Sequence, residues 1–133
     1  MNGRASLDRR SHKRFSPRSL AFVAVGAPNK KKIAHIVDIC KGGLAFHYID
    51  DGDRFNQSDC LDIYSAEEGF YLKEVPFTAV SDVEVPSEFP LSFITMRRCG
   101  IQFDTLTPSQ VSQVDDFLLN HTAGELEVVQ GFQ

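Results

Sequence analysis

The segment KKIAHIVDICKGGLAFHYI, residues 31–49, carries the clearest structural signal in the chain. Two runs rich in apolar and aromatic residues stand on either side of Gly42 and Gly43. β-Branched and aromatic residues favour strands, and adjacent glycines favour a turn. We therefore expect one strand over residues 31–40 and a second over residues 43–49.

Short apolar runs of the same kind continue on both sides of this segment. The further expected strands are residues 19–26, 60–65, 69–84 with an interruption near Pro76, and 92–104. The breaks between them contain Gly, Pro, Asn and Asp, which favour turns. Short strands at fairly regular intervals are typical of a small β-barrel or sandwich. The chain is thus expected to be dominated by β-structure.

One helix is expected near the C-terminal end. Thr107 is a good N-cap, Pro108 suits the first helical position, and Gln110 completes a capping box. The apolar stripe that follows, at three- and four-residue spacing, consists of Val111, Val114, Phe117 and Leu118. Such a stripe is expected to pack on the barrel, and the helix is expected to end near Asn120-His121.

The length of 133 residues corresponds to about one domain, because single domains usually run to ~100–200 residues. Hydrophobic residues at 42% and charged residues at 24% disfavour wholesale disorder and fibrous structure. We expect a flexible N-terminus at residues 1–7, a domain at 8–121 and a C-terminal tail at 122–133. Within the domain we expect a basic loop at 8–18, the barrel at 19–104 and the helix at 107–121. Residues 125–133 form either a short extra strand or a loose tail.

Two features of the sequence bear on location. No run of about 18 apolar residues is present, and the N-terminal MNGRASLDRRSHKR is polar and basic, unlike a signal peptide. The cysteines Cys40, Cys60 and Cys99 are odd in number and widely spaced, which fits reduced thiols better than a disulfide framework. We therefore expect no membrane span, no secretion and a cytoplasmic location.

The formal net charge of -4 divides unevenly along the chain. Residues 1–41 hold ten Lys and Arg against two Asp, which gives +8. Residues 42–133 hold four Lys and Arg against sixteen Asp and Glu, which gives -12. The basic end is suited to an anionic ligand. The alternative is that this end is simply solvated.

Signatures of catalysis and metal binding do not occur in the sequence. No GxSxG, HExxH, P-loop or GxGxxG pattern is present, so we expect a protein that is not an enzyme. The histidines His12, His35, His47 and His121 never fall with the cysteines into CxxC or HxxxH spacing. No metal or cofactor is therefore expected. His35 and His47 lie in expected strands and are interpreted as hydrogen-bonded structural residues.

Asp38 and Cys40 stand just before the double glycine. Side chains alternate across a strand, so these two are expected on the same face. A carboxylate there can accept two N–H donors at once, which is the pattern that the N1–H and N2–H₂ edge of guanine presents. The alternative is that Asp38 only caps the turn at Gly42-Gly43.

Arg10 and Arg14 stand four residues apart in the basic segment RSHKR, residues 10–14. Each guanidinium is a rigid fork that can bind phosphate through two hydrogen bonds or read O6 and N7 of guanine. Two of them in one loop can converge on one compact anion.

Taken together, these motifs resemble those of a PilZ domain, the bacterial receptor module for cyclic di-GMP. Arg10 and Arg14 match its RxxxR motif, and residues 38–43 match DxSxxG except that Cys40 replaces the serine. Residues 98–103, RCGIQF, look like the late strand of the family, which is often RxGxxF. The resemblance covers roughly residues 8–121, and the expected helix stands where the family has its C-terminal helix.

The resemblance implies a fold of six antiparallel strands in a β-barrel with one C-terminal α-helix. It also implies a bacterial, cytoplasmic sensor of the second messenger cyclic di-GMP that signals to an unidentified downstream protein by loop closure and altered protein contacts. The implied ligand-binding residues are Arg9, Arg10, Arg14, Asp38, Cys40 and Gly43. In the family, an arginine placed as Arg9 is here goes with two cyclic di-GMP molecules per chain, bound as an intercalated dimer.

Two alternatives to a nucleotide sensor remain. The first is a degenerate PilZ-like adaptor that works through protein contacts without nucleotide, a reading that Cys40 favours slightly. The second is a nucleic-acid binder that uses the basic arm and Lys30-Lys31-Lys32. The overall pI of about 5.5 and the lack of a stacking motif argue against the second, so neither DNA nor RNA is expected as a partner.

Overall fold

The computed structural model describes residues 13–18, 20–27, 29–52, 55, 59–65, 67, 69–86 and 93–125. The secondary structure elements are β1 (Phe15–Pro17), β2 (Phe22–Ala27), β3 (Lys30–Cys40), β4 (Gly43–Ile49), β5 (Cys60–Ser65), β6 (Phe70–Val85), β7 (Met96–Phe103), α1 (Pro108–Asn120) and β8 (Thr122–Glu125). In the part of the chain that these ranges cover, no helix is long and apolar enough to cross a membrane.

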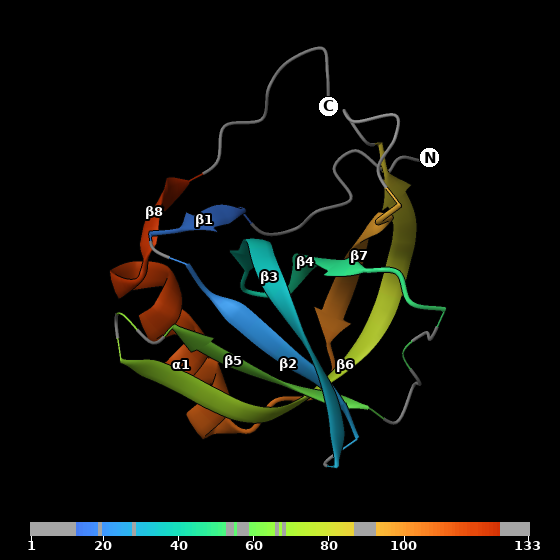
Figure 1. The fold of residues 1–133 in the computed structure, drawn as a ribbon. Coiled ribbons are helices and arrows are strands. Elements are labelled where there is room, and N and C mark those ends of the chain that lie inside the picture. Colours follow the sequence, from blue (N-terminus) through green and yellow to red (C-terminus); the bar gives the residue numbers. More distant parts are fainter. Residues whose placement is uncertain are drawn as a thin grey trace, which may run out of the picture.

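Six of these strands close into an antiparallel barrel (Figure 1). Their order is β2-β5-β6-β7-β4-β3, and pairing of β2 with β3 joins the two ends of the sheet. The short strands β1 and β8 extend the sheet outside this ring: Phe15 of β1 pairs with Ile39 of β3, and β8 pairs with β1. The expected six-stranded antiparallel barrel with a C-terminal helix is confirmed.

The barrel interior is filled by side chains that alternate along the strands. In β4, Leu44, Phe46 and Tyr48 belong to the buried core, and each is at most 3% exposed. The strands β3, β5 and β6 contribute Ile36, Leu61, Ile63 and Val75 in the same way. Full burial of such a side chain contributes about 1.5–3 kcal/mol, so this core is the main source of stability.

Helix α1 begins with the predicted capping box. The Gln110 backbone N–H donates to Thr107 Oγ1 at 3.1 Å, and the Thr107 N–H donates to Gln110 Oε1 at 2.9 Å. Val114 and Phe117 are buried, and the Phe117 ring meets Phe70 of β6 edge-on at 4.8 Å between centroids. The expected stripe is only partly buried, since Val111 remains 42% exposed.

The strand boundaries agree with expectation in the middle of the chain and differ elsewhere. β4 and β5 match the expected ranges, whereas β2 begins later, at Phe22, and β7 begins at Met96. The interruption expected near Pro76 is wrong, because β6 runs without a break from Phe70 to Val85. The backbone irregularity lies instead at Glu74, whose φ is 59°.

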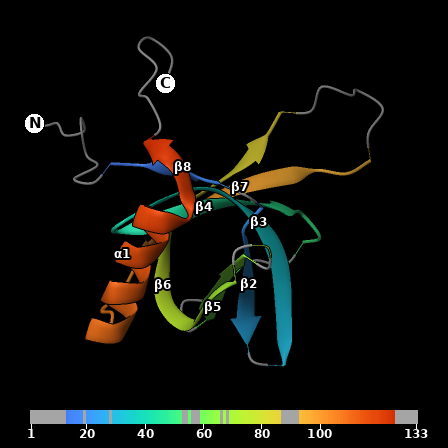
Figure 2. The ribbon, with the colours of Figure 1, turned by 90° about the vertical axis from the view of Figure 1, so that its left-hand side faces the viewer.

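The basic loop expected at residues 8–18 contains a strand, and so does the expected C-terminal tail. β1 and β8 pair with each other, and Figure 2 shows α1 leading directly into β8 beside β1. Strands of three and four residues are too short to show a period-two pattern, and a proline argues against a strand. Their pairing, with a register shift at Pro17, is a tertiary contact that local sequence does not display.

Candidate functional site

A β-bulge in β3 places the candidate residues on the outer surface of the barrel. Ala34 and Ile36 face the core, but the register with β4 shifts between Ile36 and Asp38, so that Ile39 becomes the next core residue. A bulge inserts one residue and reverses the alternation of faces that follows it. Asp38 therefore lies outside, with Cys40 on the same face as expected, opposite Ala45 and Gly43 of β4 respectively.

The Asp38 carboxylate is 7% exposed and is bound by two guanidinium groups. Arg14 donates from Nη1 to Oδ1 at 2.5 Å, and Arg98 donates from Nη2 to Oδ2 at 2.9 Å. Charge-assisted bonds of this kind are about twice as strong as neutral ones. The alternative that Asp38 only caps the turn at Gly42-Gly43 is wrong, because its carboxylate binds arginines from two distant parts of the chain.

Arg14 lies on the segment that precedes β1, 24 residues before Asp38. Its side chain is 27% exposed, yet its Nε is buried and has no hydrogen-bond partner in the described part of the chain. A guanidinium has five N–H donors, so Arg14 keeps donor capacity beyond its bond to Asp38. The other two predicted arginines, Arg9 and Arg10, lie outside the described residues.

Arg98 is a further residue of the candidate site; the sequence placed it in the late-strand motif but did not assign it to the site. It lies on β7 opposite His47 of β4 and Val83 of β6, and its side chain is 36% exposed. Its contact with Asp38 spans 60 residues of sequence. One sequence signal could have pointed to Arg98. It stands two residues before Gly100, and side chains two residues apart in a strand lie on the same face.

Two histidines continue the outer surface away from Arg98. His35 and His47 are cross-strand partners on β3 and β4, and the His35 ring lies 6.0 Å from Phe22 between centroids. Burial lowers the pKa of His47, and the neighbouring charges of Arg98 and His35 lower it further. His47 therefore takes up a proton less readily than a histidine in water.

Gly43, the last residue of the DxSxxG-like motif, has a structural reason to be glycine. It pairs with Gln102 of β7, and a Cβ at Gly43 would overlap the carbonyl oxygen of Ile101 and lie 3.0 Å from the Gln102 Cα. The close approach of β4 and β7 therefore requires glycine here whether or not a ligand binds. Cys40, in contrast, is a half-buried free thiol at the surface of the same motif.

Arg18 is engaged by the end of the helix. Its guanidinium donates to the Asn120 carbonyl oxygen, and its backbone N–H donates to the His121 carbonyl oxygen at 2.9 Å. A cation at a helix C-terminus satisfies carbonyl groups that lack partners within the helix. Arg18 thus ties the basic segment to α1.

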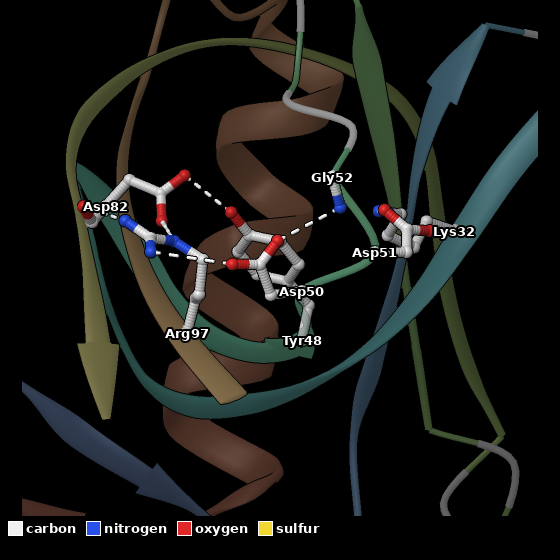
Figure 3. Close-up of polar contacts among 7 residues, drawn as sticks. All are labelled: Lys32, Tyr48, Asp50, Asp51, Gly52, Asp82 and Arg97. Atoms are coloured by element: carbon white, nitrogen blue, oxygen red, sulfur yellow. Dashed lines mark hydrogen bonds and ion pairs between the residues drawn. The ribbon is translucent and has the colours of Figure 1, made fainter. Parts of the chain in front are cut away.

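A second polar cluster lies inside one end of the barrel (Figure 3). Asp82 of β6 accepts hydrogen bonds from the Tyr48 hydroxyl at 2.6 Å and from Arg97 Nε at 2.7 Å. Arg97 also donates to the Asp82 carbonyl at 2.8 Å and lies 3.7 Å from an oxygen of Asp50. The hydrogen bond to Asp82 raises the pKa of Arg97. These groups are mutually satisfied, which is typical of a structural network.

The remaining side chains that the structure describes include three cysteines, and none of these is in a disulfide. Burial raises the pKa of the Cys99 thiol to about 12, which keeps it protonated at neutral pH. Among the described residues, no three His, Cys, Asp or Glu side chains gather in a way that could hold a metal ion.

The fold has clear counterparts among solved structures. The chain is similar over 85% of its length to a structure described as the "PilZ domain with c-di-GMP of YcgR from Escherichia coli", with a TM-score of 0.67 and 14% identity, and it covers 91% of that chain. The fold is that of a PilZ domain. The resemblance inferred from the motifs is thus confirmed at the level of the fold.

Two longer proteins match in the same way. One is YcgR from Escherichia coli in complex with c-di-GMP, with 18% identity and a TM-score of 0.58. The other is MrkH, described as a c-di-GMP dependence transcription regulatory factor, with 16% identity and a TM-score of 0.59. The chain spans 45% of the first and 50% of the second. No protein-family model matches the sequence, and no curated protein is similar to it at a significant level.

Proposed function

We propose that this protein is a receptor for cyclic di-GMP. The observation that carries the proposal is the meeting of Arg14 and Asp38 on the outer surface of a PilZ-type barrel, although 24 residues separate them. One residue comes from the RxxxR motif and the other from the DxSxxG-like motif. Two of the solved structures with the same fold are described as containing c-di-GMP, which supports the same ligand here.

Four of the predicted site residues have direct contacts with the ligand in this proposal: Arg10, Arg14, Asp38 and Cys40. Arg10 and Arg14 bind phosphate and the faces of guanine, and Asp38 accepts hydrogen bonds from the guanine edge. Cys40 stands where a serine would donate and accept. Because a thiol is a weak donor and a poor acceptor, the exchange lowers affinity by about 0.5–1.5 kcal/mol, roughly threefold to tenfold.

Signalling follows from movement of the basic segment. In the free protein Arg14 is held by Asp38; with the messenger bound, Arg14 and Arg10 turn to the phosphates, and the part of the basic loop that precedes β1 closes over the barrel. The new surface contacts an unidentified downstream protein in the bacterial cytoplasm. The protein binds its ligand and does not transform it.

Calorimetric titration of the full chain with cyclic di-GMP tests the proposal. We expect saturable binding by the parent, with about two nucleotides per chain, and about one for Arg9→Leu because the second nucleotide loses a guanidinium partner. Asp38→Ala should weaken binding. Lys73→Ala, which removes a charge from the exposed side of β6, is the matched control. A parent that gives no heat of binding and no nucleotide-induced thermal shift contradicts the proposal.

A second candidate function is that of an adaptor without nucleotide. Two observations favour it: both oxygens of Asp38 are already occupied by arginines, and Cys40 departs from the motif. The same titration separates the two functions. The nucleic-acid alternative gains little from the structure, because Lys31 and Lys32 lie 3.5 and 2.7 Å from the carboxylates of Asp62 and Asp51.

A further inference from the structure

The two arginines that bind Asp38 are held in the fold in different ways. Arg14 lies on the segment before β1, outside the strand pairings, whereas β1 itself pairs with β3 and with β8. Arg98 lies within β7, with β4 paired on one side and β6 on the other. Moving the Arg98 backbone would disrupt the barrel wall, whereas the Arg14 backbone stands outside the paired strands.

We infer that Arg98 is a positioning residue that holds the Asp38 carboxylate ready to read guanine, while Arg14 is the partner that nucleotide displaces. The inference rests on the proposed function, since it concerns how the same site recognises its ligand. It assigns the nucleotide-free state to the Arg14–Asp38 ion pair and the base specificity of the nucleotide-bound state to the Arg98–Asp38 pair.

The geometry of the carboxylate supports this division. Guanine presents the donors N1–H and N2–H₂ side by side. To accept from both, the Asp38 carboxylate must offer lone pairs that lie on the same edge of the carboxylate group. Arg14 occupies Oδ1 and Arg98 occupies Oδ2. Each oxygen accepts more than one hydrogen bond, so guanine can bind after Arg14 leaves while Arg98 stays on Oδ2.

Burial explains why Asp38 needs a permanent partner. The carboxylate is 7% exposed, and a buried charge without a partner is strongly disfavoured. The neighbouring outward positions on β4 and β7 are Ala45 and Gly100, whose side chains carry no polar group. When Arg14 departs, Arg98 remains to keep the carboxylate charged and fixed in direction.

The test compares two ligands that differ in one donor. Cyclic di-GMP carries the N2 amino group, and its inosine analogue, cyclic di-IMP, lacks it. We expect the parent to prefer cyclic di-GMP by about tenfold or more, because one hydrogen bond to a charged acceptor is lost with the analogue. We expect Arg98→Met to reduce this preference to about threefold or less, since the carboxylate is no longer oriented.

Two further variants separate positioning from simple charge. Arg14→Met should weaken binding of both ligands while keeping most of the preference, and Arg98→Lys should restore part of the preference that Arg98→Met loses. Lys73→Met is the control for net charge and should match the parent. If Arg98→Met proves too unstable in a thermal melt, Arg98→Gln and Arg98→Lys carry the same comparison.

The outcomes distinguish the inference from the proposed function. A parent that binds neither nucleotide refutes the proposed function and the inference with it. A parent that binds both equally well shows that Asp38 does not read the amino group, which overturns the inference alone. The inference is also overturned if Arg98→Met keeps the full preference for cyclic di-GMP over cyclic di-IMP, or if this variant weakens the binding of both ligands equally.

Discussion

Arg97 and Arg98 are neighbours on β7, and they serve opposite sides of the barrel wall. Arg97 points inward to Asp82 and Tyr48, and its side chain is 17% exposed. Arg98 points outward to Asp38 and is 36% exposed. Both are arginines bonded to an aspartate, so residue type and partner do not separate their roles. The alternation of side chains along the strand directs Arg97 into the barrel and Arg98 to the outer surface, where we propose that the ligand binds.

The two clusters differ in how completely they are closed. The inner cluster joins Asp82 to Tyr48 of β4 and Arg97 of β7, all within the barrel. In the outer cluster, Asp38 receives Arg14 from outside the barrel, and the Nε of Arg14 is buried without a partner in the described part of the chain. A network with spare donors can exchange partners, whereas a satisfied one only stabilises.

The largest expected effect breaks the inner cluster. Asp82→Ala leaves the Tyr48 hydroxyl and the Arg97 guanidinium without their main acceptor, and we expect a loss of about 2–3 kcal/mol in the free energy of unfolding. Denaturant unfolding monitored by circular dichroism measures this loss. Nucleotide affinity of the folded protein should not change. A stable Asp82→Ala protein would show that the inner cluster is not structural.

The outer cluster should respond in the opposite way. Arg10→Ala and Arg14→Ala each remove a charge-assisted contact to the ligand, and we expect cyclic di-GMP binding to weaken by about 1.5–3 kcal/mol. Lysine should rescue neither position fully, because it lacks the planar fork. Unfolding should hardly change. If calorimetry gives the parental affinity for both alanine variants, the site assignment is wrong.

Cys40→Ser sharpens the comparison with a smaller change. A hydroxyl is a full donor and acceptor, so we expect affinity for cyclic di-GMP to stay the same or rise by up to roughly tenfold. Calorimetric titration of parent and variant measures this change in affinity. Both titrations use the same salt concentration, because binding of charged ligands depends on ionic strength. Much weaker binding by Cys40→Ser would mean that the site is adapted to the thiol.

The smallest expected effect is a pH dependence at the outer surface. Burial, Arg98 and His35 lower the pKa of His47 in the folded protein below the ordinary value of 6.5. As the pH falls, His47 is therefore protonated in the unfolded chain before it is protonated in the folded protein. Stability should therefore decrease as the pH drops from about 7 through 6.5. His47→Gln should flatten that slope in unfolding curves measured at several pH values. A parental slope in the variant would assign the effect to other groups.

The sequence predicted those parts of the structure that depend on neighbouring residues. The capping box of Thr107 and Gln110 is local chemistry, and the helix begins where that chemistry requires. The bulge in β3 is not local: strict alternation from Ala34 and Ile36 would have turned Asp38 into the core. The outward position of Asp38 depends instead on its register against β4.

The sequence predicted the motifs of the candidate site but only part of the contacts between their residues. Asp38 and Cys40 share the expected face, but the partner Arg98 comes from 60 residues away, and no local pattern links them. β1 and β8 were missed for a related reason, since each is stabilised by pairing with the other and not by its own periodicity. Arg9 and Arg10 remain predictions.

The glycine at position 43 bears on how such sequences evolve. Its lack of a side chain is required by the Ile101 carbonyl of β7, a demand that exists in every folded copy of this barrel with or without nucleotide. Selection for folding alone would retain Gly43 in a lineage that had lost its messenger, while Arg14 and Cys40 drifted freely. The final glycine of the motif therefore reflects barrel geometry, whereas the proposed ligand site depends on the arginines and Asp38.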